Sequence, residues 1–211
     1  MLSQEQLLEV IRRFREHDPD PKIELHYNNL FTLLIAVVLS ARAKDATVNR
    51  ATQSLFLTHR TPQAFLAMDA KEMEEAFKTI GLYRTKVANI RKLCAILVDR
   101  YDGQVPTTYH ELIQLPGVGD KSANCILNVW CNQPTMPVDT HVFRVSIRLG
   151  LVPPCKTRQE VQRHLLIRIP PQDLNKMHHY LVLHGRYVCK ACKPQCAQCF
   201  LNDVCVYNAL S

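Results

Sequence analysis

Residues 115–124 read LPGVGDKSAN, a very short connection between two segments with helical spacing. Gly117 and Gly119 flank one apolar residue, Val118, so that two helices can pack closely around the turn. Glycine also lacks the Cβ that would keep a phosphate away from the backbone, and the next helix presents N–H groups and the positive end of its dipole. The stretch predicts either a phosphate-binding loop or a tight turn between packed helices.

Lys121 follows this turn at the predicted start of a helix. The helix dipole and nearby cationic charge disfavour the ammonium form there, which frees the amine as a nucleophile toward a sugar carbon. A lysine taken alone is more often a solvated surface charge. Lys121 is therefore a candidate nucleophile, and the choice between that role and a surface charge depends on a second motif.

The second motif is residues 138–145, VDTHVFRV. Asp139 comes directly before a predicted helix, where aspartate is an ordinary N-cap. A carboxylate so placed could instead activate a nucleophile or stabilise a developing sugar cation. His141 is a candidate DNA contact, with a partly buried structural histidine as the alternative.

The composition indicates an all-α protein. Of the 211 residues, 47% are hydrophobic and only six are glycine, and alternating strand patterns are scarce. Residues 29–41 are apolar on nearly all sides, as is typical of a helix in the middle of a core. The other expected helices cover residues 71–80, 83–101, 108–114, 121–131, 139–149, 158–169 and 172–188.

Three helix boundaries can be predicted from one residue or a pair of residues. Ser3 and Gln6 are spaced as a capping box for an N-terminal amphipathic helix. Asp45 is expected to cap the helix that follows the core helix, and Gly81 to end an earlier segment as a C′ glycine.

Charge and hydropathy restrict the partners. Lysine and arginine number 26 against 19 acidic residues, a net charge of +7, which fits either nucleic acid binding or a solvated basic surface. The longest apolar stretch, residues 30–39, is shorter than the roughly 20 residues that span a bilayer. The first ten residues carry no secretory pattern. We therefore expect no membrane partner and a cytoplasmic location, associated with the nucleoid if the source is bacterial.

A cysteine-rich tail suggests a metal centre. Four of the nine cysteines follow the spacing C-x6-C-x2-C-x5-C, a loop able to surround one centre with thiolates: Cys189, Cys196, Cys199 and Cys205. Spacing alone leaves zinc and iron–sulfur open. Cys192 lies inside the first gap and is interpreted as a non-ligand. The remaining cysteines are expected to be simple buried residues: Cys94, Cys125, Cys131 and Cys155.

Taken together, these segments resemble the endonuclease III family of the helix-hairpin-helix DNA glycosylases. The matching stretches run in the expected order along the chain: residues 33–45 (LLIAVVLSARAKD), 79–86 (TIGLYRTK), 115–124, 138–145, 184–187 (HGRY) and the cysteine tail. The resemblance implies a six-helix domain over residues 21–133 and a cluster domain made of residues 1–20 and 134–211. Double-stranded DNA with a damaged or abasic site would lie in the cleft between them, bound by a monomer.

The resemblance also implies residue roles. Lys121 would displace a damaged base at the sugar C1′ and form the Schiff base that drives β-elimination, with Asp139 assisting. Oxidised pyrimidines are the implied substrates, because poorly stacked bases are the easiest to flip. The implied DNA contacts are Arg42, Leu82, Gly117, Val118, Gly119, His141, Arg186, Lys190 and Lys193. The loop at residues 189–205 would hold a [4Fe–4S] cluster, and a monovalent cation would sit on the carbonyls of Ile113, Leu115 and Val118.

Two positions depart from the family pattern. Arg42 stands where the family usually has a glutamine that fills the gap left by the flipped base, so we expect an altered preference for the opposite base. Asp120 replaces a basic residue and is expected to weaken phosphate attraction and to favour the charged form of Lys121. Leu82 matches an apolar wedge of the family, with a core leucine as the alternative.

Two other functions compete with this interpretation. A monofunctional adenine glycosylase shares the scaffold and the cluster but lacks the lysine, so Lys121 and an end at Ser211 argue against it. A non-catalytic DNA-binding module with a zinc loop would use the hairpin alone, and its behaviour would not depend on Lys121.

Overall fold

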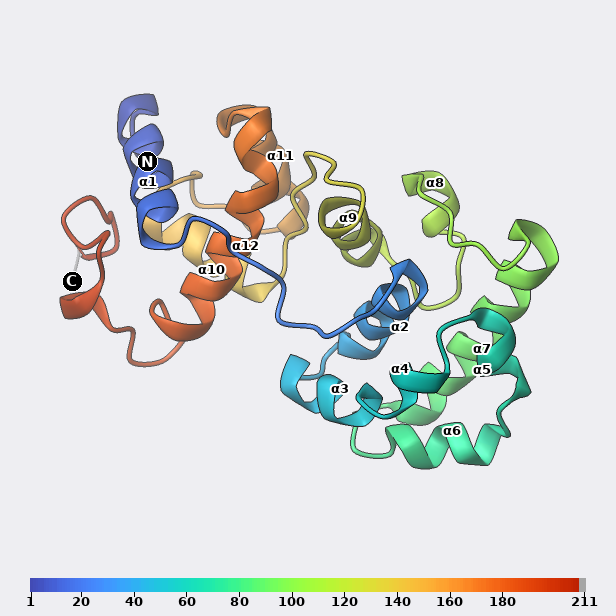
Figure 1. Ribbon diagram of the computed structural model, residues 1–211. Helices are drawn as coiled ribbons and strands as arrows, with labels where there is room; N and C mark the ends of the chain where they lie inside the picture. The colour runs from blue at the N-terminus through green and yellow to red at the C-terminus, as the bar shows by residue number, and fades with distance from the viewer. Residues whose placement is uncertain (209–211) are drawn as a thin grey trace. The chain divides into compact units, whose positions relative to one another are not determined.

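The computed structural model describes residues 1–208, which form helices and connecting turns and contain no β-strand (Figure 1). The prediction of an all-α fold is confirmed. The chain forms two compact units, Glu24–Cys131 and the pair Met1–Ile23 with Asn132–Ser211. Over the described part of the chain, no helix is long and apolar enough to cross a membrane.

The unit Glu24–Cys131 contains eight helical segments, two of which, α4 and α8, are single turns of four residues. The segments are α2 (Leu30–Ser40), α3 (Asp45–Thr52), α4 (Leu55–Thr58), α5 (Pro62–Ala67), α6 (Ala70–Phe77), α7 (Tyr83–Tyr101), α8 (Tyr109–Leu112) and α9 (Asp120–Val129).

Helix α2 is the centre of this unit. Asn29 and Thr32 form a capping box at its start, and every residue from Phe31 to Leu39 is buried. Helices α3, α7 and α9 all contact it. Burying one large aliphatic side chain stabilises a fold by about 1.5–3 kcal/mol, so this helix contributes much of the unit's core. The expectation of a helix buried on all sides is confirmed.

Several predicted boundaries were wrong. Lys44 is the N-cap of α3 and Asp45 is its first residue. Helix α6 ends at Phe77, and Gly81 does not have the positive φ of a C′ glycine. That conformation is taken instead by Leu82, whose φ is 60°. The helical pattern at residues 108–114 shortens to the single turn α8 after its N-cap Thr108.

The other unit is formed by both ends of the chain: α1 (Gln4–His17), α10 (Thr140–Leu149), α11 (Arg158–Arg168), α12 (Pro171–Tyr187) and the 3₁₀ turn η1 (Cys196–Gln198). The predicted capping box of Ser3 and Gln6 is present at the start of α1. Phe14 on α1 stacks on Tyr180 of α12, with ring centroids 5.1 Å apart. The backbone N–H of Leu2 donates to the Gly150 carbonyl at 2.8 Å, so the chain start is part of this core.

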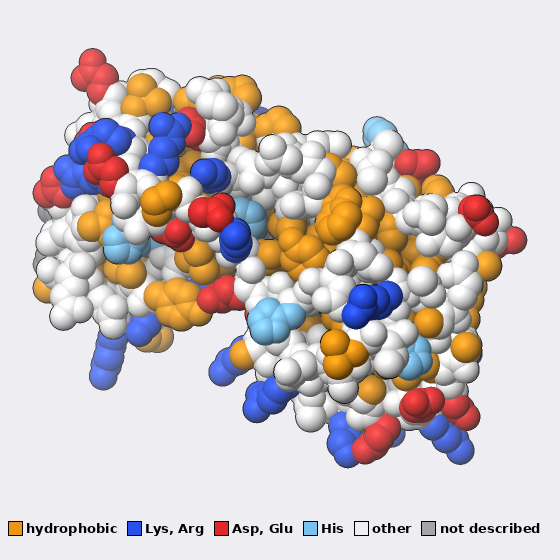
Figure 2. Space-filling view, in the orientation of Figure 1, with side chains coloured by type: hydrophobic (Ala, Val, Ile, Leu, Met, Phe, Trp, Pro, Cys, Tyr) orange, Lys and Arg blue, Asp and Glu red, His pale blue; other side chains and the backbone are white. Residues whose placement is uncertain are grey.

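Surface charge is mixed on the face that Figure 2 shows. Acidic and basic side chains alternate over α1 and over α6. On α1, Arg12 forms ion pairs with both Glu9 and Glu16, and beside α6 Lys78 pairs with Glu75. The positive charge of these two elements is therefore largely offset by acidic neighbours, and they are poor candidates for a polyanion surface.

Candidate active site and metal centre

The glycines of the α8–α9 hairpin have two different roles. Gly117 has a φ of 84°, and a Cβ at this position would lie 3.3 Å from Cγ1 of Val38 on α2. Gly119 is the N-cap of α9 and is exposed, and a Cβ there would meet no atom within 4 Å. Gly117 therefore serves the turn and its packing, whereas Gly119 leaves the backbone at the helix start open to a ligand.

Lys121 is the second residue of α9 and is half-buried. Because the N-cap is a glycine, no side chain caps this helix start. The first N–H groups of a helix lack partners within the helix, so an uncapped start favours an anionic ligand. The structure thus places the candidate nucleophile beside a backbone suited to a phosphate.

The carboxylate of Asp120 is held by two neighbours. Its Oδ1 accepts hydrogen bonds from the Tyr109 hydroxyl at 2.9 Å and from Nδ2 of Asn124 at 3.1 Å. The hydrogen bond to Asp120 raises the pKa of Tyr109. The acidic residue that departs from the family pattern therefore links α8 to α9.

Asp139 is the N-cap of α10, as predicted. Its Oδ1 accepts from the backbone N–H groups of His141 and Val142, each at 2.8 Å, and its Oδ2 lies 3.1 Å from Nδ1 of His141. Both side chains are partly exposed, 22% for Asp139 and 29% for His141. The carboxylate is fixed in one orientation and accessible. Asp139 and Lys121 belong to different units of the chain.

Close packing of α10 on α12 explains the glycine of the HGRY stretch. A Cβ on Gly185 would lie 2.8 Å from the Cβ of His141 and 3.1 Å from Cγ2 of Val145. Neither of these atoms is the end of a flexible side chain. Gly185 therefore lets the helix that carries His141 approach α12.

The two candidate gap-filling residues share an unusual backbone. Leu82 and Arg42 have φ values of 60° and 57°, in the left-handed region that non-glycine residues rarely occupy. Both side chains are exposed, and Leu82 is 62% accessible, which excludes the core-leucine alternative. Each such conformation costs about 1–3 kcal/mol and must be held by its surroundings.

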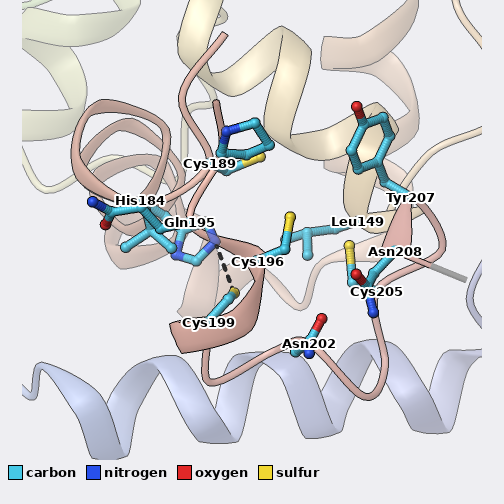
Figure 3. A pocket seen from close by; sticks show the side chains of 12 residues that line it. Leu149, His184, Cys189, Gln195, Cys196, Cys199, Asn202, Cys205, Tyr207 and Asn208 are labelled. Carbon is cyan, nitrogen blue, oxygen red and sulfur yellow. Dashed lines mark hydrogen bonds between the residues drawn. The ribbon is translucent and has the colours of Figure 1, made fainter. Parts of the chain in front are cut away.

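The four cysteines of the predicted metal loop line one pocket, whose empty volume is about 320 Å³. Figure 3 shows Cys189, Cys196, Cys199 and Cys205 around this hollow, with a dashed line from Cys199 to His184. Cys192 is exposed and does not line it. Within residues 1–208, no three His, Cys, Asp or Glu side chains are drawn together around a single ion position.

The ring of His184 faces these thiols. Nε2 of His184 lies 3.6 Å from Sγ of Cys199, and burial lowers the pKa of His184 to about 4, so its ring is neutral at pH 7. Burial also raises the pKa of Cys199, so its thiolate needs a compensating positive charge. A metal centre at this pocket would supply that charge, and four thiols in an apolar setting are the donor set that iron–sulfur clusters use.

Arginines that the sequence analysis did not single out hold the loop in place. Arg148 donates to the carbonyls of Lys190 at 2.7 Å and Ala191 at 3.1 Å, and its Nη1 is 3.7 Å from Sγ of Cys189. Arg144 donates to the carbonyls of Gly185 and Cys189. Arg144 lies within the motif at residues 138–145, and Arg148 follows it at i+4 on α10, which were the sequence signals for this pair.

The remaining predicted residues are placed as follows. Lys190 and Lys193 are exposed on the cysteine loop, and Arg186 is half-buried in the last turn of α12. Cys94 and Cys125 are buried as expected. Cys131 and Cys155 are only half-buried, so the prediction that they are simple core residues was wrong.

Comparison with known proteins defines the class. Residues 35–171 match the HhH-GPD superfamily of base excision DNA repair proteins. Endonuclease III of Rickettsia prowazekii is 47% identical over 94% of this chain and 93% of its own. Endonuclease III of Escherichia coli K12 is 44% identical over 95% of each chain.

Solved structures agree with this class. A trapped endonuclease III–DNA covalent intermediate matches 100% of this chain and 99% of its own, with a TM-score of 0.93 and 43% identity. A thermostable thymine-DNA glycosylase, 19% identical with a TM-score of 0.83, shares the fold. Fold and hairpin thus define a base-excision DNA repair protein of the HhH-GPD superfamily.

Within that superfamily, the chain belongs to the endonuclease III family. The protein is accordingly a base-excision repair enzyme, a DNA glycosylase with abasic-site lyase activity.

Proposed function

We propose that the protein removes oxidised pyrimidines from double-stranded DNA and then cleaves the abasic strand through a Schiff base on Lys121. The position of Lys121, half-buried at the uncapped start of α9 and directly after the hairpin, carries this proposal. The relative trapped in a covalent intermediate with DNA supports it.

The reaction begins when the uncharged amine of Lys121 attacks C1′ of the damaged nucleotide and the base leaves with its bonding electrons and a proton. The C1′–O4′ bond then breaks, with its electrons and a proton from solvent going to O4′, while the nitrogen lone pair forms the C1′ iminium, which acidifies the C2′ hydrogens. Loss of a C2′ proton breaks the C3′–O bond and releases the 3′ phosphate. Water then hydrolyses the iminium and frees the lysine.

Asp139 assists at the sugar. Its Oδ1 is occupied by two backbone N–H groups, and its Oδ2 faces His141. A carboxylate fixed in this way needs little reorganisation when positive charge develops on the sugar, which is how preorganised groups lower a barrier.

The DNA contacts fall into two groups. Leu82 and Arg42 fill the gap left by the flipped nucleotide, Leu82 as an apolar wedge and Arg42 as a hydrogen-bond donor to the opposite base. The contacts to the sugar-phosphate backbone of the DNA are made by Gly117, Val118, Gly119, His141, Arg186, Lys190 and Lys193. A monovalent cation on the carbonyls of Ile113, Leu115 and Val118 completes the hairpin.

A [4Fe–4S] cluster occupies the cysteine loop, held by Cys189, Cys196, Cys199 and Cys205. The cluster supplies four metal–sulfur bonds that fix the loop, and base removal requires no electron transfer. Four thiols around one pocket are the donor set of an iron–sulfur cluster, and the resemblance of their spacing to the endonuclease III loop favours the cluster over zinc. Iron and acid-labile sulfide in anaerobically purified protein support this assignment, and zinc without sulfide contradicts it.

The remaining assignments concern the setting of the enzyme. It acts as a monomer, in the cytoplasm and in association with the nucleoid if the source is a bacterium.

Borohydride trapping tests the proposal. Wild-type protein, Lys121→Ala and Lys92→Ala are mixed with a duplex that carries one oxidised pyrimidine and, separately, with an abasic duplex. Lys92 is exposed on α7 and controls for the loss of one positive charge. We expect adducts from wild type and Lys92→Ala but not from Lys121→Ala. If wild type forms no adduct on either duplex, the Schiff-base mechanism fails and a monofunctional glycosylase or a binding module takes its place.

A further inference from the structure

Lys86 is a buried lysine to which the proposed mechanism gives no role. It lies in the first turn of α7, and only 6% of its surface is accessible. Its ammonium donates to the carbonyls of Leu39 at 2.9 Å and Ala41 at 2.7 Å. Burial lowers the pKa of Lys86. Lysine is almost never buried unless its charge is paired, so a buried lysine with two backbone acceptors calls for an explanation.

The charge of Lys86 suits the helix that it contacts, not the helix that carries it. A cation in the first turn of α7 opposes the dipole of α7, whereas the two carbonyls belong to the C-terminal end of α2, where a cation is favourable. Helix α2 has no basic residue in its own last turn. Lys86 therefore supplies the cation that the end of α2 lacks.

Lys86 joins the two segments that carry the candidate gap-filling residues. Its side chain binds the carbonyl of Ala41, the residue before Arg42. Leu82 is the N-cap of α7, and its carbonyl accepts the helix's i→i−4 bond from the backbone N–H of Lys86 at 3.1 Å. The side-chain bond to Ala41 therefore ties the Arg42 segment to the helix start that Leu82 caps. Leu82 and Arg42 are both held in the left-handed conformation, so each needs contacts that keep it there. One residue thus contacts the backbone beside both.

We infer that Lys86 is a positioning residue that fixes the spacing and conformation of the Arg42 and Leu82 turns, and thereby sets how the enzyme fills the gap opposite the damaged base. This inference rests on the gap-filling roles proposed above for Arg42 and Leu82. It assigns no chemical step to Lys86.

Hydrogen exchange on the free protein tests the structural part. Lys86→Met removes the ammonium but keeps an unbranched apolar stem, and Lys92→Met, on the exposed side of the same helix, is the matched control. We expect amide exchange at residues 40–44 to rise about tenfold in Lys86→Met, as loss of a charge-assisted hydrogen bond would produce. Exchange in α10 of Lys86→Met should match wild type, and so should exchange at residues 40–44 of Lys92→Met. Unchanged exchange at residues 40–44 in Lys86→Met contradicts the inference.

Binding to an abasic duplex with 2-aminopurine opposite the lesion tests the functional part. In wild type, gap filling unstacks the 2-aminopurine and raises its fluorescence. Lys86→Met should lose most of this rise and bind about tenfold more weakly. At saturating enzyme it should still form the borohydride adduct, because Lys121 is intact. Lys86→Arg, which keeps a charged donor, should restore part of the fluorescence rise.

The controls separate the possible failures. If Lys86→Met does not fold, Lys86→Gln keeps a neutral donor and should give faster exchange at residues 40–44 and a smaller fluorescence rise than wild type. A wild type that forms no adduct refutes the proposed function. A wild type that does form the adduct, beside Lys86 variants with wild-type exchange and fluorescence, refutes the positioning role alone.

Discussion

Asp139 accepts a hydrogen bond from the backbone N–H of His141 at 2.8 Å through Oδ1, while its Oδ2 lies 3.1 Å from Nδ1 of the same histidine. One carboxylate thus caps α10 and also presents its second oxygen beside the imidazole of His141. The structural and chemical roles of Asp139 can be separated because asparagine is as good an N-cap as aspartate.

Asp139→Asn should therefore leave the free energy of unfolding within about 0.5 kcal/mol of wild type, whereas Asp139→Ala should lower it by about 1 kcal/mol. Both changes should slow single-turnover adduct formation by about a hundredfold or more, because both remove the negative charge. Urea unfolding and borohydride trapping measure the two effects. A wild-type rate of adduct formation in Asp139→Asn would show that Asp139 serves only as a helix cap.

The two hairpin glycines should respond differently to alanine. Gly117→Ala forces a side chain into φ +84° against Val38 and should lower the free energy of unfolding by about 1–2 kcal/mol. Gly119→Ala has open space and should change stability by less than about 0.5 kcal/mol. It should nevertheless weaken binding to an abasic duplex, because in the proposed complex its Cβ would lie between a phosphate and the uncapped start of α9. Equal DNA affinity of Gly119→Ala and wild type would argue against phosphate binding there.

Removing the charge of Asp120 should strengthen DNA binding. Asp120→Asn keeps an oxygen for the Tyr109 hydroxyl but removes a negative charge from the start of α9. We expect the Kd for an abasic duplex to fall about threefold to tenfold at low salt, with a smaller difference at 0.5 M salt. Asp99→Asn, at an exposed position on α7, is the control and should leave the Kd unchanged. A Kd difference that does not depend on salt would point to a change in shape.

Gly185→Ala should disturb the contact between α10 and α12. The new Cβ would lie 2.8 Å from the Cβ of His141, and overpacking of this kind costs about 1–3 kcal/mol. Thermal unfolding of the purified variant measures the loss. Because Arg144 holds the Gly185 carbonyl, the shift should also reach the cysteine loop and lower the iron content. A melting temperature equal to that of wild type would show that the two helices can separate without strain.

Stability should fall as the solution becomes acidic, in part through His179. Burial lowers the pKa of this residue from 6.5 to about 4 in the folded protein. The unfolded chain therefore takes up a proton first, so the contribution of His179 to stability is complete above pH 6.5 and is lost as the pH falls toward 4. The full loss is about 3 kcal/mol. His179→Gln should flatten the slope of unfolding free energy against pH in this window, and an unchanged slope would mean that the ring is already protonated when folded.

Local sequence rules predicted the features that depend on residues close together in the chain. The capping box of Ser3 and Gln6, the cap at Asp139 and the buried helix at residues 29–41 each follow from a pattern of a few residues. The four pocket cysteines were likewise selected by their spacing, which brings them around one hollow.

Features that depend on distant partners could not be predicted. Lys86 resembles a surface lysine in the sequence, because its two acceptors lie 47 and 45 residues earlier in the chain. Gly81 looked like the residue most able to adopt a positive φ, yet that conformation belongs to Leu82, the N-cap of α7, whose carbonyl accepts from the backbone N–H of Lys86. Cys131 is only half-buried and is the last residue of its unit along the chain, a boundary that no local pattern encodes.

Two contacts join the N-terminal segment to later parts of the chain: the Leu2 backbone hydrogen-bonds to Gly150, and Phe14 stacks on Tyr180. These contacts affect how the chain folds during synthesis on the ribosome. Domains tend to fold as the nascent chain emerges, and α1 leaves the exit tunnel before the unit Glu24–Cys131, whereas its partner α12 leaves after that unit. The unit Glu24–Cys131 can therefore fold while the apolar face of α1 is still without its partner α12. For that interval we expect α1 to be a substrate for a chaperone that shields amphipathic segments, and we expect the metal loop, which lies later in the chain, to assemble after the unit Glu24–Cys131 has folded.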